Sequence, residues 1–333
     1  MARRARIALI ITGGTIDSLG VDRLDMAWYI EAGKRLDAGE LMARVPELAS
    51  VANVEEVPFR RLPSQSIGDR DLLDLVALIH RLFDEKRADG IVITHGTNTL
   101  EETAYFLHLT LKRDKPVVLV GSMRPPSALS ADGDLNLLNA VRVAAAPAAR
   151  GLGVLVVLNE TILSARDVTK TATYRTDTFQ ARDLGPLGYA DNDGRVLIYH
   201  RPARAHTTKT EFDISGLEAL PRVDIVVSYL GADGAMIDVA VASGARGIVS
   251  AGTGAGRPTP GEEAALVRAS AAGTIVVQAT RVGSGRTVSS PGLRRKGWSA
   301  ADNLQPWKAR MLLALALTRT TDVAEIQRMF DTY

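Results

Sequence analysis

Short apolar runs alternate with longer amphipathic segments along most of this chain. The apolar runs are rich in β-branched residues and too short for helices, which is typical of strands buried on both faces. In the larger part of the chain they lie at residues 7–11, 91–93, 117–120, 154–158 and 196–199. Helical patterns lie between them, for example at residues 69–84 and 100–112. This alternation predicts βαβ units and a parallel sheet.

A second, smaller series of the same kind follows toward the C-terminus. Its strands are predicted at residues 225–229, 248–250 and 275–277, and a helix at residues 260–272. The stretch before it is polar and contains Pro202 and Pro221, as expected for an interdomain connection. We therefore predict a two-domain α/β fold, with a larger N-terminal domain at residues 1–200, a linker at residues 201–222 and a smaller C-terminal domain at residues 223–333.

The composition of the chain excludes several classes of catalytic site and binding partner. The chain has no cysteine, which excludes disulfides, thiolate catalysis and cysteine-ligated metal sites. Its 40 Lys and Arg against 38 Asp and Glu give no overall field that favours nucleic acid or a membrane. The histidines lack metal-binding spacing and the glycine cluster at residues 252–256 departs from the nucleotide-binding pattern, so neither a metal nor an organic cofactor is predicted. The first apolar run is too short for a signal peptide or a membrane span, so the predicted location is the cytoplasm, or the periplasm if a leader was removed.

Two threonine-glycine turns directly follow predicted strands. They read Thr12-Gly13-Gly14-Thr15 and Thr94-His95-Gly96-Thr97. Parallel strands present their C-terminal ends at one edge of a sheet, where ligands bind, and glycine lets the backbone turn sharply with its N–H groups exposed. Such an edge suits a hydroxyl nucleophile. The alternative interpretation is that Thr15 and Thr97 only cap the helices that follow them.

A lysine, Lys170, lies in the polar segment Asp167-Val168-Thr169-Lys170-Thr171. A lysine in such a segment is usually a solvated surface residue. If it is buried beside a hydroxyl, however, its pKa falls and it can act as the base that a threonine nucleophile needs. The residues alone leave both interpretations open.

Taken together, these segments resemble the bacterial-type L-asparaginase and glutaminase-asparaginase family over nearly the whole chain. The segments that carry the resemblance are Thr12-Gly13-Gly14-Thr15-Ile16, Ser64-Gln65, Ile93-Thr94-His95-Gly96-Thr97, residues 101–107, residues 116–125, Ser130-Ala131-Asp132-Gly133, residues 167–171 and Gly185-Pro186-Leu187-Gly188-Tyr189. The resemblance implies a larger N-terminal and a smaller C-terminal α/β domain. It also implies intimate dimers that assemble into a homotetramer, with active sites between subunits.

The resemblance further implies residue roles, which place catalysis in the N-terminal domain without metal or cofactor. Thr15 would be the nucleophile that attacks a side-chain amide carbonyl, and Tyr29, on a mobile flap, would help to activate it. Thr97 and Lys170 would form a second pair of hydroxyl and amine. The groups that hold the substrate would come from Gly14, Ser64, Gln65, Gly96, Asn98 and Ser122, with Ser64 and Gln65 on its α-carboxylate.

Three positions depart from the family's pattern. Asn98 stands where the family has an aspartate that binds the substrate's α-ammonium, and the loop at residues 289–296 is basic where the family supplies an acidic residue. Arg257 ends the segment Gly254-Ala255-Gly256-Arg257, in which the family has an asparagine. A buried ammonium without its carboxylate partner costs about 3–5 kcal/mol. Asp17 could replace the lost contacts, or Arg257 could meet a substrate of different charge.

The sequence therefore predicts an amidohydrolase of the asparaginase type that acts on the small-molecule amide L-asparagine or a close analogue. Two alternatives remain. One is a hydrolase of the same fold for a small carboxylated amide that lacks the α-ammonium. The other is a non-catalytic homologue that only binds amides.

Overall fold

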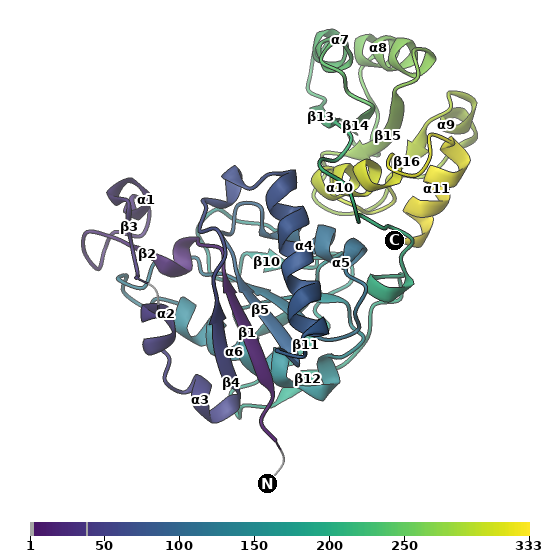
Figure 1. Cartoon of the computed structure of the whole chain (residues 1–333). Coiled ribbons are helices and arrows are strands. Elements are labelled where there is room, and N and C mark those ends of the chain that lie inside the picture. Colours follow the sequence, from purple (N-terminus) through teal and green to yellow (C-terminus); the bar gives the residue numbers. More distant parts are fainter. Residues whose placement is uncertain (1–2, 38) are drawn as a thin grey trace. The chain divides into compact units, whose positions relative to one another are not determined.

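The computed structural model describes residues 3–37 and 39–333. The chain divides into two compact units, Met1–Lys209 and Thr210–Tyr333 (Figure 1). Each unit has its own sheet and its own hydrophobic core. This confirms the predicted two-domain α/β class. No helix in the described ranges is both long and apolar enough to cross a membrane.

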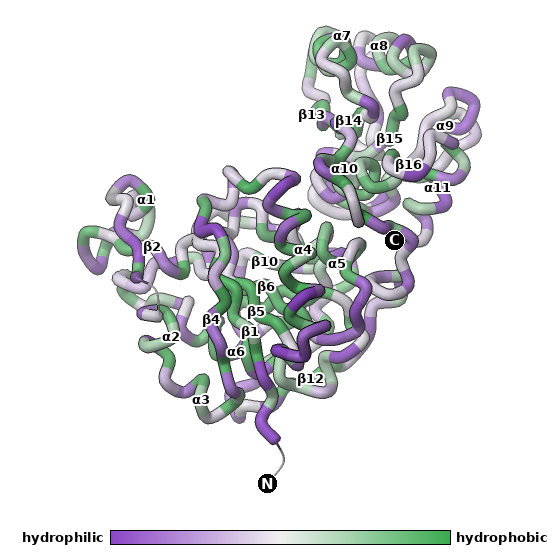
Figure 2. Tube along the Cα trace, in the orientation of Figure 1, coloured by the Kyte–Doolittle hydropathy of each residue, from purple (hydrophilic) through white to green (hydrophobic). Residues whose placement is uncertain are grey.

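The first unit is built on an eight-stranded sheet in the order β12-β11-β8-β7-β6-β5-β1-β4. Its strands are β1 (Arg6–Ile11), β4 (Asn53–Val57), β5 (Gly90–Thr94), β6 (Val117–Val120), β7 (Val154–Leu158), β8 (Thr161–Ser164), β11 (Gly188–Ala190) and β12 (Val196–Ile198). The five strands from β4 to β7 in this order are parallel. The strands β5, β6 and β7 are completely buried, and Figure 2 shows β5 and β6 as hydrophobic segments at the centre of the unit. Burial on both faces explains why these strands read as continuous apolar runs.

Helices cover both faces of this sheet. The helices α4 (Asp69–Asp84) and α5 (Leu100–Thr110) pack against each other on one face (Figure 1). On the other face, α6 (Gly133–Ala145) packs against β5, β6 and β7, with the short helices α2 (Glu40–Ala43) and α3 (Leu48–Val51) in the same hydrophobic cluster. In α4 the buried side chains recur at the spacing of one helix face, which is why its sequence is amphipathic.

One end of the sheet is antiparallel, so the predicted parallel arrangement covers the strands from β4 to β7 and not the whole sheet. The strand predicted at residues 196–199 forms as β12, but it pairs antiparallel with β11, and β8 pairs antiparallel with β7. The cause is the two-residue turn between β7 and β8, where Asn159 and Glu160 have φ values of 49° and 58°. Two consecutive residues with positive φ join antiparallel strands directly. Glu160 carries no turn signal in the sequence.

Two small antiparallel ladders stand outside the main sheet. In the first, β2 (Ser18–Leu19) pairs with β3 (Lys34–Arg35), and the helix α1 (Tyr29–Ala32) between them projects beside the sheet (Figure 1). In the second, β9 (Thr169–Lys170) pairs with β10 (Phe179–Gln180). The two ladders position Tyr29 and Lys170.

The second unit contains a four-stranded parallel sheet in the order β13-β14-β15-β16. Its elements are β13 (Val223–Val227), α7 (Ala235–Ala242), β14 (Gly247–Gly252), α8 (Pro260–Ala271), β15 (Ile275–Thr280), α9 (Pro291–Arg295), β16 (Ser299–Ala300), α10 (Pro306–Ala316) and α11 (Val323–Thr332). The three strands and the helix predicted for this series are all present, with their boundaries shifted by a few residues.

Candidate active site

The two threonine-glycine turns lie side by side. The strands that lead into them are parallel neighbours, with Ile11 opposite Thr94, so both turns leave the same edge of the sheet. Gly13 and Gly14 have φ values of 96° and 117°. A Cβ on Gly14 would lie 2.6 Å from the Cα of Gly96. Glycine is therefore required at this contact, which joins the backbones of the two turns.

The hydroxyl of Thr15 is paired with a phenol. Thr15 begins the short 3-10 helix η1 (Thr15–Asp17), and its Oγ1 lies 2.7 Å from the hydroxyl of Tyr29. Both side chains are buried. Burial raises the pKa of Tyr29, while the hydrogen bond to Thr15 opposes this shift, so the phenol is protonated at neutral pH. Thr15 therefore has a neutral partner with which it can exchange a proton.

The second threonine has an amine partner. Lys170 Nζ donates a hydrogen bond of 2.9 Å to the Oγ1 of Thr97. Burial lowers the pKa of Lys170, and the carboxylate of Glu101 acts in the opposite direction. Glu101 Oε1 accepts hydrogen bonds from the backbone N–H of Lys170 at 3.0 Å and from the hydroxyl of Thr169 at 3.3 Å, which fixes this strand in place. Lys170 is thus a half-buried amine against a hydroxyl, not a solvated surface residue.

Neither threonine acts as a helix cap. Thr99 occupies the N-cap position of α5, and Gly14 occupies that of η1. Thr97 precedes the cap of α5 by two residues, and its hydroxyl faces Lys170. The hydroxyls of Thr15 and Thr97 therefore serve the edge of the sheet and not the helices that follow.

Polar groups from two further segments lie beside these turns. Asn98 Nδ2 donates a hydrogen bond of 3.2 Å to Gln65 Oε1, and both side chains are exposed. Thr99 Oγ1 donates to the carbonyl oxygen of Ser64 at 2.8 Å, which ties the 3-10 helix η2 (Ser64–Ser66) to the second turn. The Oγ of Ser64 is buried without a hydrogen-bond partner among the described residues, and a Cβ on Gly96 would lie 2.7 Å from it.

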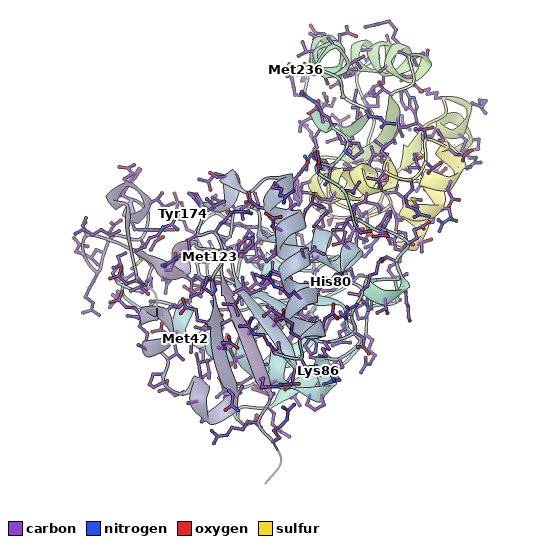
Figure 3. The ribbon with its side chains drawn as sticks, viewed as in Figure 1. Met42, His80, Lys86, Met123, Tyr174 and Met236 are labelled. Atoms are coloured by element: carbon purple, nitrogen blue, oxygen red, sulfur yellow. The ribbon has the colours of Figure 1, made fainter. Side chains whose placement is uncertain are left out.

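The loop after β6 completes this edge. Ser122 is buried, and its hydroxyl donates to the carbonyl of Arg124 at 2.9 Å. The carboxylate of Asp132 accepts hydrogen bonds from the backbone N–H groups of Met123 and Arg124 at 3.0 and 2.9 Å. Figure 3 shows Met123 and Tyr174 at the same end of the unit. The hydroxyl of Ser122 is therefore committed to the loop.

Asp17 and Arg257, the two charged residues that the sequence suggests for the substrate site, have different surroundings. Asp17 is completely buried and forms an ion pair with Arg61, with 2.7 Å between Asp17 Oδ2 and the guanidinium. Arg257 is exposed in the second unit, and its backbone pairs with Thr253. Within the described ranges, no cluster of three His, Asp or Glu side chains could hold a metal.

We expect the variant Arg61→Met to destabilise the first unit by about 2–3 kcal/mol, because it leaves the carboxylate of Asp17 buried without its charge partner. The expected loss is smaller than for a fully buried pair because the Arg61 side chain is 30% exposed. Urea unfolding followed by circular dichroism measures the loss. The double variant Asp17→Asn with Arg61→Met should recover a large part of it, and an equal loss in both variants would contradict this account.

His95, inside the second turn, is held neutral by burial. Its ring is completely buried, and burial lowers its pKa to about 4, while the hydrogen bond to Gly96 opposes the shift. Nδ1 lies 2.8 Å from the carbonyl oxygen of Gly96, which can only accept, so the neutral ring carries its proton on Nδ1. Nε2 has no partner among the described residues. His95 therefore shapes the turn and does not act as a base.

This histidine predicts acid sensitivity. Between pH 6.5 and 4 the unfolded chain binds the proton that the folded chain excludes, so the stability from His95 is complete above pH 6.5 and falls as the pH drops. Between pH 7.5 and 5 the contribution of His95 to the free energy of unfolding falls by about 2 kcal/mol. His80 and His206, whose pKa values burial also lowers, add to the loss in the wild type. Urea unfolding at the two pH values should therefore give a loss that is about 2 kcal/mol smaller for His95→Gln than for the wild type. His200→Gln, at an exposed position, is the control and should behave like the wild type.

Sequence reasoning missed the residues that support the site. Glu101 fixes Lys170, Asp132 shapes the loop after β6, and Arg61 neutralises Asp17. A carboxylate in the first turn of a helix, such as Glu101, reads from sequence as a favourable helix start. In the fold, β9 supplies other partners for this carboxylate, the hydroxyl of Thr169 and the backbone N–H of Lys170. These contacts join residues distant in the chain, so no local pattern marks them.

Comparisons with known proteins agree with one another. Residues 6–204 match the family described as "Asparaginase, N-terminal", and residues 222–330 match the "Glutaminase/Asparaginase C-terminal domain". The chain is 45% identical to L-asparaginase 2 of Bacillus subtilis (strain 168), over 98% of this chain and 86% of that protein. It is 41% identical to the glutaminase-asparaginase of Pseudomonas fluorescens biotype A, over 99% of this chain and 91% of that protein. The crystal structure of a probable cytoplasmic L-asparaginase from Campylobacter jejuni matches with a TM-score of 0.95 at 41% identity, over 99% of this chain and 100% of that one.

Proposed function

The chain belongs to the asparaginase family, and from this premise we propose that it hydrolyses the side-chain amide of L-asparagine, or of a close analogue, to a carboxylate and ammonia. The observation that carries the proposal is the pair of hydroxyls on adjoining turns, each with its own proton partner. Thr15 lies against a phenol at 2.7 Å and Thr97 against an amine at 2.9 Å. This is an arrangement for covalent acyl transfer by a hydroxyl nucleophile.

Thr15 is the nucleophile in this proposal, and Tyr29 relays its proton. The Thr15 Oγ1 forms a bond to the amide carbonyl carbon, and its proton passes through the Tyr29 hydroxyl to the leaving nitrogen. The carbon–nitrogen bond then breaks and ammonia leaves. In the second half of the reaction, a water oxygen bonds to the acyl carbon, the ester bond to Thr15 breaks, and the threonine recovers its proton. Tyr29 suits this relay because its raised pKa keeps it protonated.

Thr97 and Lys170 supply the second proton path. A neutral Lys170 amine accepts a proton from the Thr97 hydroxyl, which in turn orients the attacking water. The lowered pKa of Lys170 supports this role, because it raises the fraction of neutral amine near neutral pH. Backbone groups around Gly14, Thr97 and Ser122 polarise the carbonyl or hold the amide.

Ser64, Gln65 and Asn98 hold the rest of the substrate. Ser64 and Gln65 bind its carboxylate, and the unpartnered hydroxyl of Ser64 supports this assignment. The hydrogen bond between Asn98 and Gln65 keeps both carboxamides beside the turns. None of these groups requires a cofactor for the reaction.

Ammonia release from purified protein tests the proposal. The substrates are L-asparagine, L-glutamine, D-asparagine and succinamate, assayed side by side for the wild type and Thr15→Ala. We expect release from at least one of them, and loss of that release in the variant. No release from any amide would overturn the proposal and favour a protein that only binds amides.

The same proposal includes assembly of intimate dimers into a homotetramer. In the single chain, the second unit exposes large apolar side chains on α7 and the turn before it, including Tyr229, Leu230, Met236 and Val239. Figure 3 labels Met236, and Figure 2 shows α7 as a largely hydrophobic segment. Contiguous exposed apolar groups of this kind mark protein interfaces. Light scattering on the purified protein decides between one chain and four.

The proposed location is the cytoplasm. The matching Campylobacter jejuni protein is named a probable cytoplasmic L-asparaginase, which supports the same assignment here. Fractionation of the native host cells, with antibody detection, tests it. Recovery in the periplasmic fraction would overturn it.

A further inference from the structure

Four acidic side chains near the two threonines hold other partners. Four carboxylates lie close to the reacting hydroxyls: Asp17, Asp25, Glu101 and Asp132. Asp17 follows Thr15 by two residues, and Glu101 contacts the backbone of Lys170. The negative charges of Asp25 and Asp132 both help to raise the pKa of the Tyr29 hydroxyl, so they lie within electrostatic reach of it.

Two of these carboxylates are bound by backbone N–H groups. Asp25 accepts hydrogen bonds from Val21 at 3.1 Å and Trp28 at 2.9 Å, inside the hairpin. Asp132 accepts from Met123 and Arg124, and also from Asn136 Nδ2 at 3.0 Å. Each carboxylate is therefore part of the framework that shapes its loop.

The other two are buried. Asp17 has no exposed surface, and its charge is balanced by Arg61. Glu101 is 6% exposed and accepts from Lys170 N and Thr169 Oγ1. Neither can turn toward a substrate without breaking these contacts. The Oδ1 of Asp17 has no hydrogen-bond partner among the described residues, but its carboxylate is fully buried and its charge is balanced through Oδ2 by Arg61. None of the four carboxylates therefore offers an unbalanced charge to a cation bound beside the threonines.

The positive charges at the same edge are less completely balanced. Arg35 lies against the first turn, since a Cβ on Gly13 would come within 2.9 Å of its guanidinium. This guanidinium donates a hydrogen bond of 3.4 Å to the carbonyl of Arg61, and it has no carboxylate partner among the described residues. Lys170 adds a second positive charge at the other turn whenever its amine is protonated. The edge therefore favours an anion over a cation.

The exposed groups at the substrate end are neutral carboxamides. Asn98 Nδ2 is used by Gln65 Oε1, which leaves Asn98 Oδ1 and Gln65 Nε2 available to a ligand. An acceptor and a donor side by side suit a hydroxyl group or a carboxylate. An ammonium would find one neutral oxygen and no opposite charge, at the cost of its own desolvation.

From this distribution of charge we infer that the preferred substrate is a short amide that carries a carboxylate but no ammonium group, such as succinamate or 2-hydroxysuccinamate. The inference rests on the proposed function and narrows its substrate class. The reaction is unchanged: the amide carbon is attacked, and ammonia leaves. What changes is the charge of the substrate: the site accepts a monoanion instead of a zwitterion.

Steady-state ammonia release from L-asparagine, succinamate and 2-hydroxysuccinamate tests this inference. We expect kcat/KM for succinamate to exceed that for L-asparagine by roughly tenfold or more. The variant Asn98→Asp adds the missing charge and should move the ratio by about 100-fold toward L-asparagine. Asn192→Asp adds the same charge at an exposed turn of the same unit and should leave the ratio unchanged.

Product binding gives a readout that does not need turnover. By calorimetry, succinate should bind the wild type more tightly than L-aspartate does, and Asn98→Asp should reverse the order. A higher kcat/KM for L-asparagine than for succinamate in the wild type would overturn the inference and leave the proposed function intact. If none of the amides releases ammonia, the proposed function is overturned. The relative affinities for succinate and L-aspartate then test the charge preference by themselves. Tighter binding of L-aspartate, or binding of neither product, would overturn that preference.

Discussion

The variant Thr15→Ala is expected to lower kcat by about 10³-fold or more, because it removes the oxygen that forms the covalent bond to the substrate. The Thr15 side chain is buried, and its hydroxyl is hydrogen-bonded to that of Tyr29. Alanine fits the same space, so the fold should survive. Ammonia release under substrate saturation measures the effect, and thermal unfolding confirms that the variant is folded.

Two controls make this result specific to the nucleophile. Thr15→Ser keeps a hydroxyl at the same position and should retain most of the lost activity. Thr208→Ala removes a threonine hydroxyl at an exposed position of the same unit and should leave kcat unchanged. If Thr15→Ala keeps more than about a tenth of the wild-type kcat, the bond to substrate is formed by another group, and Thr97 becomes the candidate.

The variant Lys170→Met is expected to lower kcat by about 10²–10⁴-fold, because it removes the base in contact with Thr97. Burial lowers the pKa of Lys170, so the neutral amine becomes more abundant as the pH rises. Wild-type activity should therefore increase with pH up to this pKa, which lies below the ordinary lysine value of 10.5. The residual activity of Lys170→Met should lack this increase. A pH profile of kcat measures both effects.

Matched variants separate the base from a simple positive charge. Lys170→Arg keeps a cation at the site but cannot lose its proton at these pH values, so it should not restore activity. Lys86→Met removes an exposed lysine of the same unit, seen in Figure 3, and should keep the wild-type pH profile. If Lys170→Arg is as active as the wild type, the lysine acts through its charge and not as a base.

The fold follows from sequence wherever burial is continuous. The runs at residues 117–120 and 154–158 are strands with the predicted boundaries, because every side chain in them is buried and apolar. Prediction failed where strands are short or set by turns. The antiparallel end of the sheet depends on two consecutive positive φ values at Asn159 and Glu160, and the backbone there is imposed by pairing with the rest of the sheet.

The active site likewise has parts that the sequence predicts and parts that it does not. The glycines and threonines of both turns are visible in the sequence, because a sharp turn after a buried strand needs those residue types. No local pattern marks the partners of the threonines, and only the family resemblance names them. Tyr29 follows Thr15 by 14 residues and reaches it through a hairpin, while Lys170 lies 73 residues beyond Thr97 and reaches it through β9.

The sequence by itself determined the fold class and the family, because buried apolar runs and glycine turns are local patterns. The tertiary structure decided which charges are available at the site. From the sequence, Asp17 could be a carboxylate available to the substrate, but in the fold it forms a buried ion pair with Arg61. Lys170 lies in a polar segment of the sequence, but in the fold it is a half-buried amine in contact with Thr97. The state of an ionisable group depends on its burial and on charges brought near it from distant parts of the chain, and only the folded protein sets these.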